Sequence, residues 1–247
     1  FAVKDAATGQ HKGSFYMDIY ARPHKRPQAW CLPLRDGEPA ADGPPGEPHL
    51  AALMANFAPP VPGQPQLMHH GDVYMLFHEF GHMMHYMLGR TRYRRQGSPT
   101  IAWDFAETPS QLLENLAWQP AVLSQFAFHY QTGEPYPADL LGKLAASRSF
   151  MPATSHMRSL TVAKLDLELH MNYQKHFAGK ELDAASSELL AQWTAPYTVT
   201  PPSVMRNLLH CFQGGYAAGY YSYKWSESLS ADAFNHIQEK GMLNPEV

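Results

Sequence analysis

Short apolar and alternating runs, separated by segments rich in glycine and proline, occupy roughly the first 60 residues and predict β-structure. Residues 1–3 and 14–20 are rich in β-favouring and aromatic side chains, and the turn sequence between them predicts a hairpin. A third strand is predicted at 50–57, where two following prolines make a helix too short. Residues 35–48 carry too many glycines and prolines for a central strand, so we expect a surface loop.

From about residue 69 the apolar positions change to helical spacing. They recur every three or four residues over 69–88, and Gly89 is placed to end that helix. A second helix is predicted from Asp104 or Thr108 to Tyr130, with a bend near Pro120. Further helices are expected over 138–146, 160–177 and 184–193, and beyond Tyr216. The predicted fold is mainly α with a small N-terminal β-sheet: a β-rich part over about 1–60 and a helical part over about 68–247.

Composition and charge narrow the function classes. The chain has 247 residues, 45% of them apolar, and a net charge of −3. These values exclude a disordered tail and disfavour a nucleic-acid binder. No apolar run approaches the roughly 18 residues that span a bilayer, so no membrane partner is expected. The opening residues lack a secretory signal, and two distant cysteines, Cys31 and Cys211, are expected to be free thiols of a cytoplasmic protein.

The strongest chemical motif is HExxH, at residues 78–82 within the first predicted long helix. Four residues turn a helix by about 400°, so His78 and His82 project from one face, one turn apart. Two imidazole nitrogens at that spacing can bind a single Zn²⁺ at about 2.0–2.1 Å. Glu79 lies beside the first histidine, where a carboxylate can take a proton from a metal-bound water.

A catalytic zinc needs a third protein ligand and an open fourth position. His85 lies nearly a full turn beyond the histidine pair, so sharing their metal would strain the geometry. Glu107 is the better candidate, because overlapping helix-start signals place it at the beginning of the next helix, which can return antiparallel. Chemistry alone leaves Glu107, Glu114 and other carboxylates as alternatives for this ligand.

These motifs resemble the thimet-oligopeptidase family of zinc peptidases, and AWQPAVLSQFAFHYQTGEPYPADLL is similar to its bacterial oligopeptidase A branch in particular. HEFGHMMH is followed after 24 intervening residues by the glutamate of DFAETPSQLLENLAW. GSFYMDIYARPHKR resembles the strand segment before the family's active site, and QGGYAAGYYSYKWSESLSADAF resembles its glycine–tyrosine loop. Family members are much longer, so we expect residues 1–247 to be the C-terminal catalytic region only, without the N-terminal helical region.

The resemblance implies a zincin-like catalytic domain with one Zn²⁺ per chain. It implies His78, His82 and Glu107 as metal ligands and Glu79 as the general base. Tyr223 and His210 correspond to transition-state stabilisers, while Tyr216 and Tyr220, with Gly214 and Gly215, correspond to a substrate-binding loop. Three glycines in six positions give that loop freedom, so we expect it to be mobile or displaced without substrate, with the Tyr223 hydroxyl away from the metal.

The predicted function is a zinc-dependent oligopeptidase that hydrolyses internal bonds of short peptides. Its substrate backbone is expected to pair with a sheet edge near 50–57. One alternative is a peptidyl-dipeptidase that removes C-terminal dipeptides. Another is a fragment that binds zinc and peptide without turnover. The expected partners are short peptides and the missing N-terminal region of the same protein.

Overall fold

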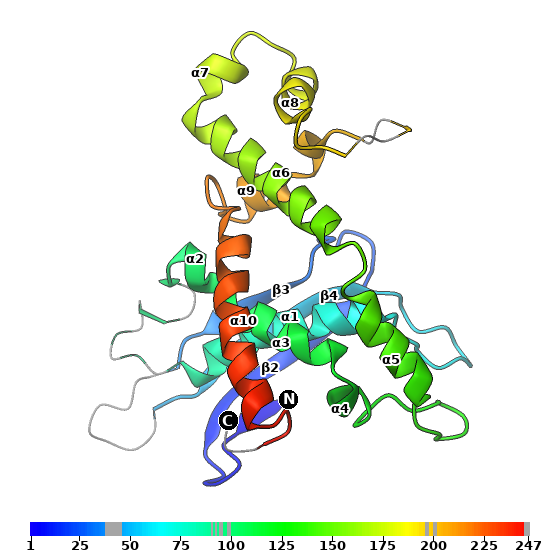
Figure 1. The fold of residues 1–247 in the computed structure, drawn as a ribbon. Helices are drawn as coiled ribbons and strands as arrows, with labels where there is room; N and C mark the ends of the chain where they lie inside the picture. Colours follow the sequence, from blue (N-terminus) through cyan, green and yellow to red (C-terminus); the bar gives the residue numbers. More distant parts are fainter. Residues whose placement is uncertain are drawn as a thin grey trace.

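The protein is mainly helical, with one small sheet packed on a long helix (Figure 1). A computed structural model describes residues 1–37, 46–89, 100–195 and 202–244, together with positions 91, 93, 96, 97, 198 and 199. The four arginines at positions 90, 92, 94 and 95 lie outside these residues. Among the described residues, no helix is both long and apolar enough to cross a membrane.

The sheet has four strands in the described part of the chain. They are β1 (Ala2–Lys4), β2 (His11–Tyr20), β3 (Trp30–Arg35) and β4 (His49–Phe57), in the order β1-β2-β4-β3. β1 and β2 pair antiparallel, which confirms the predicted hairpin. β4 pairs parallel with β2 and antiparallel with β3, so it lies inside the sheet rather than at an edge.

The position of β4 corrects the predicted substrate-binding edge. The free edge near the helices belongs to β3, a strand that the sequence did not predict. Pro33 within β3 disfavours a strand assignment, because proline cannot donate to a sheet ladder. An edge strand tolerates proline, since its outer side has no ladder to complete.

Helix α1 (His70–Leu88) lies across the sheet and forms the core of this half of the molecule (Figure 1). Met83 and Met87 on its inner face pack with Phe15 of β2 and Leu53 of β4. The helix ends at Leu88, before Gly89, as the apolar spacing predicts. This packing fixes which side of α1 faces away from the sheet, and His78 and His82 lie on that side.

The predicted helix from 104 or 108 to 130 is wrong as a single element. The structure has α2 (Trp103–Ala106), α3 (Thr108–Glu114), the 3-10 helix η3 (Asn115–Trp118) and α4 (Pro120–Leu123). Glu107 separates α2 from α3, capping the end of one and the start of the other. Pro120 begins α4, so it starts a new helix rather than bending a continuous one.

Apart from α5 (Ala138–Ser147), which lies beside α4, the remaining helices form an upper unit and one long return helix (Figure 1). In the upper unit, side chains from α6, α8 and the segments after them make a second core around Leu165, Phe177 and Leu208. The predicted helix at 160–177 starts eight residues earlier and is interrupted at Asn172. The elements are α5 (Ala138–Ser147), α6 (Pro152–Met171), α7 (Tyr173–His176), α8 (Leu182–Leu190), η4 (Val204–Asn207), α9 (Leu209–Gln213) and α10 (Ser222–Lys240).

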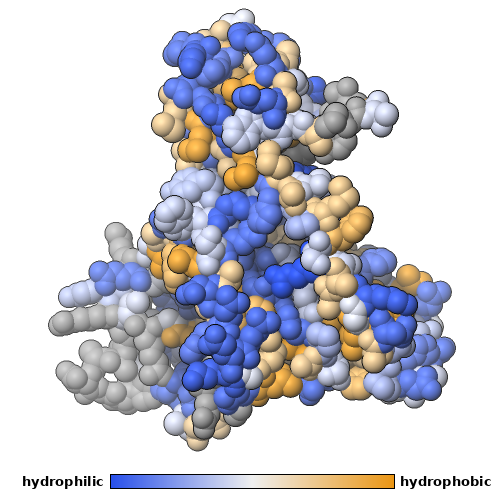
Figure 2. Space-filling view, in the orientation of Figure 1, coloured by the Kyte–Doolittle hydropathy of each residue, from blue (hydrophilic) through white to orange (hydrophobic). Residues whose placement is uncertain are grey.

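Helix α10 connects the two cores. It descends from the upper unit and packs against α2 and α3, and its outward face is mainly hydrophilic (Figure 2). The Ser226 hydroxyl donates to the Asp104 carbonyl at 2.8 Å, and the Gln111 amide donates to the Tyr223 carbonyl at 2.9 Å. These bonds hold the first turns of α10 beside the residue that separates α2 from α3.

Candidate active site

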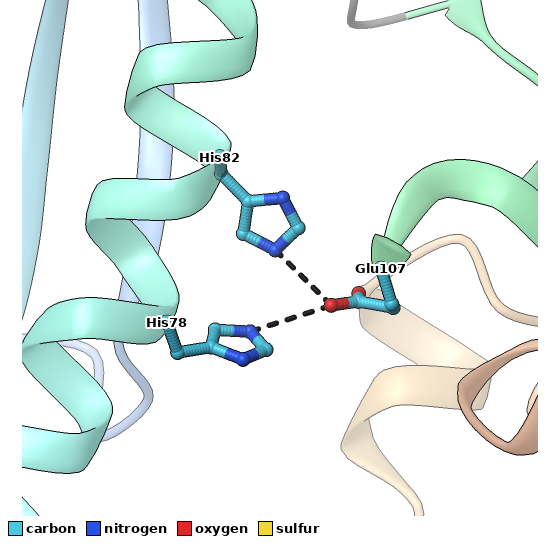
Figure 3. A group of neighbouring side chains, drawn as sticks. All are labelled: His78, His82 and Glu107. Carbon is cyan, nitrogen blue, oxygen red and sulfur yellow. Dashed lines mark ion pairs between the residues drawn. The ribbon is translucent and has the colours of Figure 1, made fainter. Parts of the chain in front are cut away.

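Three side chains converge beside α1 (Figure 3). His78 and His82 project from successive turns of α1 toward Glu107. Glu107 Oε2 lies 3.3 Å from His78 Nε2 and 3.2 Å from His82 Nε2. One ligand atom from each residue lies within 4.8 Å of the other two. The grouping found among the described residues does not include His85.

Gly81, inside the HExxH motif, lets α3 approach α1 closely. A Cβ atom at this position would lie 2.5 Å from both the Pro109 carbonyl oxygen and the Ser110 Cα. Both contacts are with backbone, which has no rotamer by which to move away. The missing side chain of Gly81 therefore brings the start of α3, and with it Glu107, to the histidine pair.

Glu114, the alternative third ligand, lies on the other side of His78. Its Oε1 is 2.5 Å from His78 Nδ1, while Nε2 of the same ring faces Glu107. The Tyr74 hydroxyl donates to Glu114 Oε2. Burial lowers the pKa of His78, but the hydrogen bond to Glu114 and the charge of Glu107 raise it to about 9. Glu114 is thus placed to orient the ring.

Glu107 is almost completely buried, and both of its carboxylate oxygens have partners. Glu107 is 1% exposed. Its Oε1 accepts a hydrogen bond from the Tyr216 hydroxyl, and its Oε2 accepts one from the Ser110 hydroxyl at 2.8 Å. Burial raises the pKa of Glu107, but His82, His78 and the Tyr216 hydroxyl outweigh it and lower the pKa to about 2. A fixed carboxylate beside two imidazoles is the donor set that catalytic zinc prefers.

Glu79 is buried, with 4% of the residue exposed. Its Oε2 has no hydrogen-bond partner among the described residues, and the carboxylate lines the same cavity as Cys31 of β3. Burial raises the pKa of Glu79 above its usual value. A carboxylate with one unpaired oxygen and a raised pKa is a stronger proton acceptor than an exposed one.

The glycine–tyrosine segment 214–223 is not displaced in this structure. Tyr216 and Tyr223 stack with ring centroids 5.2 Å apart. Because Tyr216 also donates to Glu107, the segment lies against the proposed metal ligands. The structure therefore shows the segment packed beside the histidine pair, and its mobility without substrate stays a prediction. Tyr216, expected to contact substrate, contacts Glu107.

Asp166 on α6 holds this segment in place, and no sequence pattern pointed to it. Its buried carboxylate accepts the backbone N–H groups of Ala218 at 3.0 Å and Tyr220 at 2.9 Å. Ala218 has a φ of +54°, which is strained for a residue with a Cβ, and Gly215 has a φ of +85°. Local sequence cannot reveal this anchor, because Asp166 lies 50 residues away on another helix.

A cavity of about 370 Å³ opens beside the three converging side chains. Tyr220 and Gly215 are outside the described part of its lining, and Tyr220 instead packs against the upper core. Edge strand β3 forms the opposite wall through Trp30, Cys31 and Pro33. The expected site residues that line it are His78, Glu79, His82, Glu107, His210, Gly214, Tyr216 and Tyr223.

Comparison with known proteins decides the family. The model of peptidase family M3 matches residues 1–247. The chain belongs to peptidase family M3. It is 40% identical over 237 residues to oligopeptidase A of Salmonella typhimurium, and 40% identical over 239 residues to oligopeptidase A of Escherichia coli. Each match covers 96% of this chain and 35% of the relative.

A second kind of M3 peptidase is also similar. The dipeptidyl carboxypeptidase of Escherichia coli is 32% identical over 234 residues, covering 94% of this chain and 34% of that protein. The chain therefore spans about a third of the length of these relatives. Membership of family M3 and the similarity to oligopeptidase A confirm the resemblance seen in the sequence.

Proposed function

We propose that this chain forms the zincin-like catalytic region of a zinc-dependent oligopeptidase that hydrolyses internal bonds of short peptides. One observation carries the proposal: His78, His82 and Glu107 offer ligand atoms within 4.8 Å of one another, on the wall of the cavity that Glu79 also lines. The oligopeptidase A relatives support the reaction class.

The donor set fits one zinc ion. Two neutral imidazole nitrogens and one carboxylate are typical of catalytic zinc, and they leave a position for water or substrate. Glu107 is ionised, and Glu114 and Ser110 orient the surrounding donors. When bound, zinc supplies Lewis acidity that polarises the scissile carbonyl and lowers the pKa of water.

Glu79 is the proposed general base. Its unpaired Oε2 accepts the proton of the attacking water and then delivers that proton to the leaving amine. His78 and His82 lie before and after Glu79 in the HExxH sequence. Both histidines face Glu107, so neither occupies the accepting oxygen of Glu79.

Tyr223 and His210 are the proposed oxyanion donors. Burial and the charge of Glu107 raise the pKa of Tyr223 well above its usual value, so its hydroxyl stays protonated. Desolvation lowers the pKa of His210, so a neutral imidazole faces the cavity at neutral pH. Tyr216 orients Glu107 through a hydrogen bond. Tyr220 packs against Tyr223, and their ring centroids lie 5.0 Å apart.

Tyr223→Phe is expected to lower kcat by about 10²–10³-fold, the range for removal of one oxyanion donor. The ring still stacks on Tyr216, so zinc affinity is expected to stay within about twofold. Single-turnover kinetics and zinc titration on the natural-length protein measure the two effects. Tyr221→Phe, at an exposed position that does not line the described cavity, is the matched control. Equal kcat for Tyr223→Phe and wild type would remove Tyr223 from the mechanism.

Glu114→Gln is expected to weaken zinc binding by about 10–100-fold, because a carboxylate behind a metal-binding histidine fixes the ring and raises its basicity. An amide keeps the size of the side chain and can still accept from Tyr74. Competition with a chromogenic chelator gives the affinity. An affinity equal to wild type would show that Glu114 only fills space.

Substrate backbone is proposed to pair with the outer edge of β3, which the structure offers in place of the 50–57 strand. Cys31 of β3 and Glu79 line the same cavity, so this edge lies beside the proposed base. An extended peptide that adds to an edge strand gains main-chain hydrogen bonds without a requirement for sequence. A cytoplasmic location is also proposed, since a relative of Arabidopsis thaliana is named a probable cytosolic oligopeptidase A.

Peptidyl-dipeptidase activity is the second candidate, favoured by 32% identity to a dipeptidyl carboxypeptidase. Cleavage of internally quenched peptides by the natural-length protein separates the candidates by the position of the cut. Chelation is expected to abolish hydrolysis, and one equivalent of zinc to restore it. Hydrolysis that survives complete zinc removal would contradict the proposal. Zinc and peptide binding without any cleavage would support the binding-only alternative.

A further inference from the structure

The cavity has an arginine at the end where β3 begins. Arg26 lines the same cavity as Glu79 and Tyr223, and its guanidinium lies 5.7 Å from the centroid of the Trp30 ring. Histidines apart, it is the one basic side chain in the described lining of that cavity. We propose that Arg26 binds the free C-terminal carboxylate of the peptide substrate. This inference rests on the proposed function.

The backbone that bears Arg26 is fixed on both sides. The Lys25 side chain is 3% exposed, and its ammonium donates to the backbone carbonyls of Asp18 at 2.8 Å and Tyr20 at 2.9 Å. The Asn56 amide donates to the carbonyls of Arg26 at 2.9 Å and Gln28 at 2.8 Å. A guanidinium that extends from a fixed backbone and stacks on Trp30 has lost much of its freedom before a ligand binds.

The positive charge of Arg26 has no acidic partner within the described structure. Two other arginines of the sheet region have acidic partners: Arg22 pairs with Asp18 at 2.6 Å, and Arg35 pairs with Glu47 at 3.1 Å. No described carboxylate forms an ion pair with Arg26. Glu107, an acid of the same cavity, already faces the His78–His82 pair. The guanidinium is therefore available to an anionic group of a ligand.

The direction of β3 identifies which end of a peptide reaches Arg26. β3 runs from Trp30 to Arg35, and Arg26 precedes its first residue. A peptide bound antiparallel to this edge runs toward Trp30, so its C-terminal end lies beside Arg26. A peptide bound parallel would place its N-terminal ammonium there, next to a like charge. Charge complementarity thus selects the antiparallel direction and the carboxylate.

A guanidinium suits this ligand because its planar fork donates two parallel hydrogen bonds to one carboxylate. Such a contact ties cleavage to a short distance from the substrate's C-terminus. The proposed substrate class is therefore short peptides with an unblocked C-terminus.

The test uses two internally quenched peptides of identical sequence, one ending in a free carboxylate and the other in a carboxamide. We expect the zinc-loaded, natural-length wild type to prefer the free acid on the order of tenfold in kcat/KM. Arg26→Gln is expected to remove this preference, so that kcat/KM becomes equal for the free acid and the carboxamide. Arg26→Lys keeps the charge without the fork and is expected to retain part of the preference. Arg22→Gln, on the same segment but outside the described lining, is expected to behave as wild type.

Two results would overturn the inference: equal rates for both peptides in wild type, or an undiminished preference in Arg26→Gln. If the true ligand of Arg26 is an acidic side chain of the substrate, the two peptides are cleaved at equal rates, because the C-terminal amide does not alter that side chain. If the wild type cleaves neither peptide, the proposed function fails separately. Calorimetric titration with the same two peptides then decides whether Arg26 distinguishes acid from amide in binding.

Discussion

Glu79→Gln is expected to lower kcat by about 10²–10⁴-fold and to leave one bound zinc per chain, because the amide cannot accept the proton of the attacking water. Glu79 Oε2 has no partner in the described structure, so the substitution breaks no hydrogen bond there. It also removes a buried charge, and we expect the melting temperature to be equal to or above that of wild type.

The Glu79→Gln experiment needs both turnover and metal content. Single-turnover hydrolysis gives the chemical step, and metal analysis of the same sample gives the zinc stoichiometry. Glu239→Gln makes the same chemical change at an exposed position of α10 and is expected to match wild type. Near-normal hydrolysis by Glu79→Gln would exclude Glu79 as the base. Loss of zinc would instead show that it supports the metal site.

Glu107→Gln is expected to have the other large effect, a loss of both zinc and turnover. A neutral amide is a poor zinc ligand, so affinity should fall by more than the roughly 100-fold upper range for a residue behind the ligands. The amide oxygen can still accept from Tyr216, which keeps the glycine–tyrosine segment closed. Hydrolysis should drop to the level of chelator-treated wild type.

Chelator competition and thermal unfolding of metal-free protein distinguish a lost ligand from a lost fold. The metal-free variant is expected to unfold at a temperature close to that of metal-free wild type. Glu114→Gln is the matched comparison, because it changes the carboxylate on the other side of His78 and should lose much less affinity. An unchanged zinc affinity in Glu107→Gln would remove Glu107 from the ligand set.

Local spacing was sufficient to predict the centre of the site. The i, i+4 separation of His78 and His82 fixes their common face wherever that segment is helical, and α1 is a helix of 19 residues. The hairpin of β1 and β2 was predictable for the same reason, since turn and strand residues are adjacent in sequence. On chemistry alone, Glu107 and Glu114 were equal candidates for the third ligand. The family resemblance favoured Glu107, and in the structure Glu107 faces His78 Nε2 while Glu114 contacts Nδ1 of the same ring.

Features that depend on distant contacts were not predictable. Strand β3 was not predictable, because Pro33 disfavours a strand and only the assembled sheet shows that this strand occupies an edge. The break at Glu107 follows from the close approach of α3 to Gly81, a contact between segments almost 30 residues apart. The closed glycine–tyrosine segment depends on Asp166 of α6, whereas its glycines alone favoured mobility.

The central claim is that His78, His82 and Glu107 bind one zinc ion with an open fourth position. Anomalous diffraction at the zinc absorption edge, on crystals of the zinc-loaded natural-length protein, tests it most directly. We expect one peak per chain, at about 2.0–2.2 Å from His78 Nε2, His82 Nε2 and a Glu107 oxygen, with water or no atom in the fourth position. A peak away from these residues, or a fourth protein ligand such as His85 closing the site, would contradict the proposed catalytic centre.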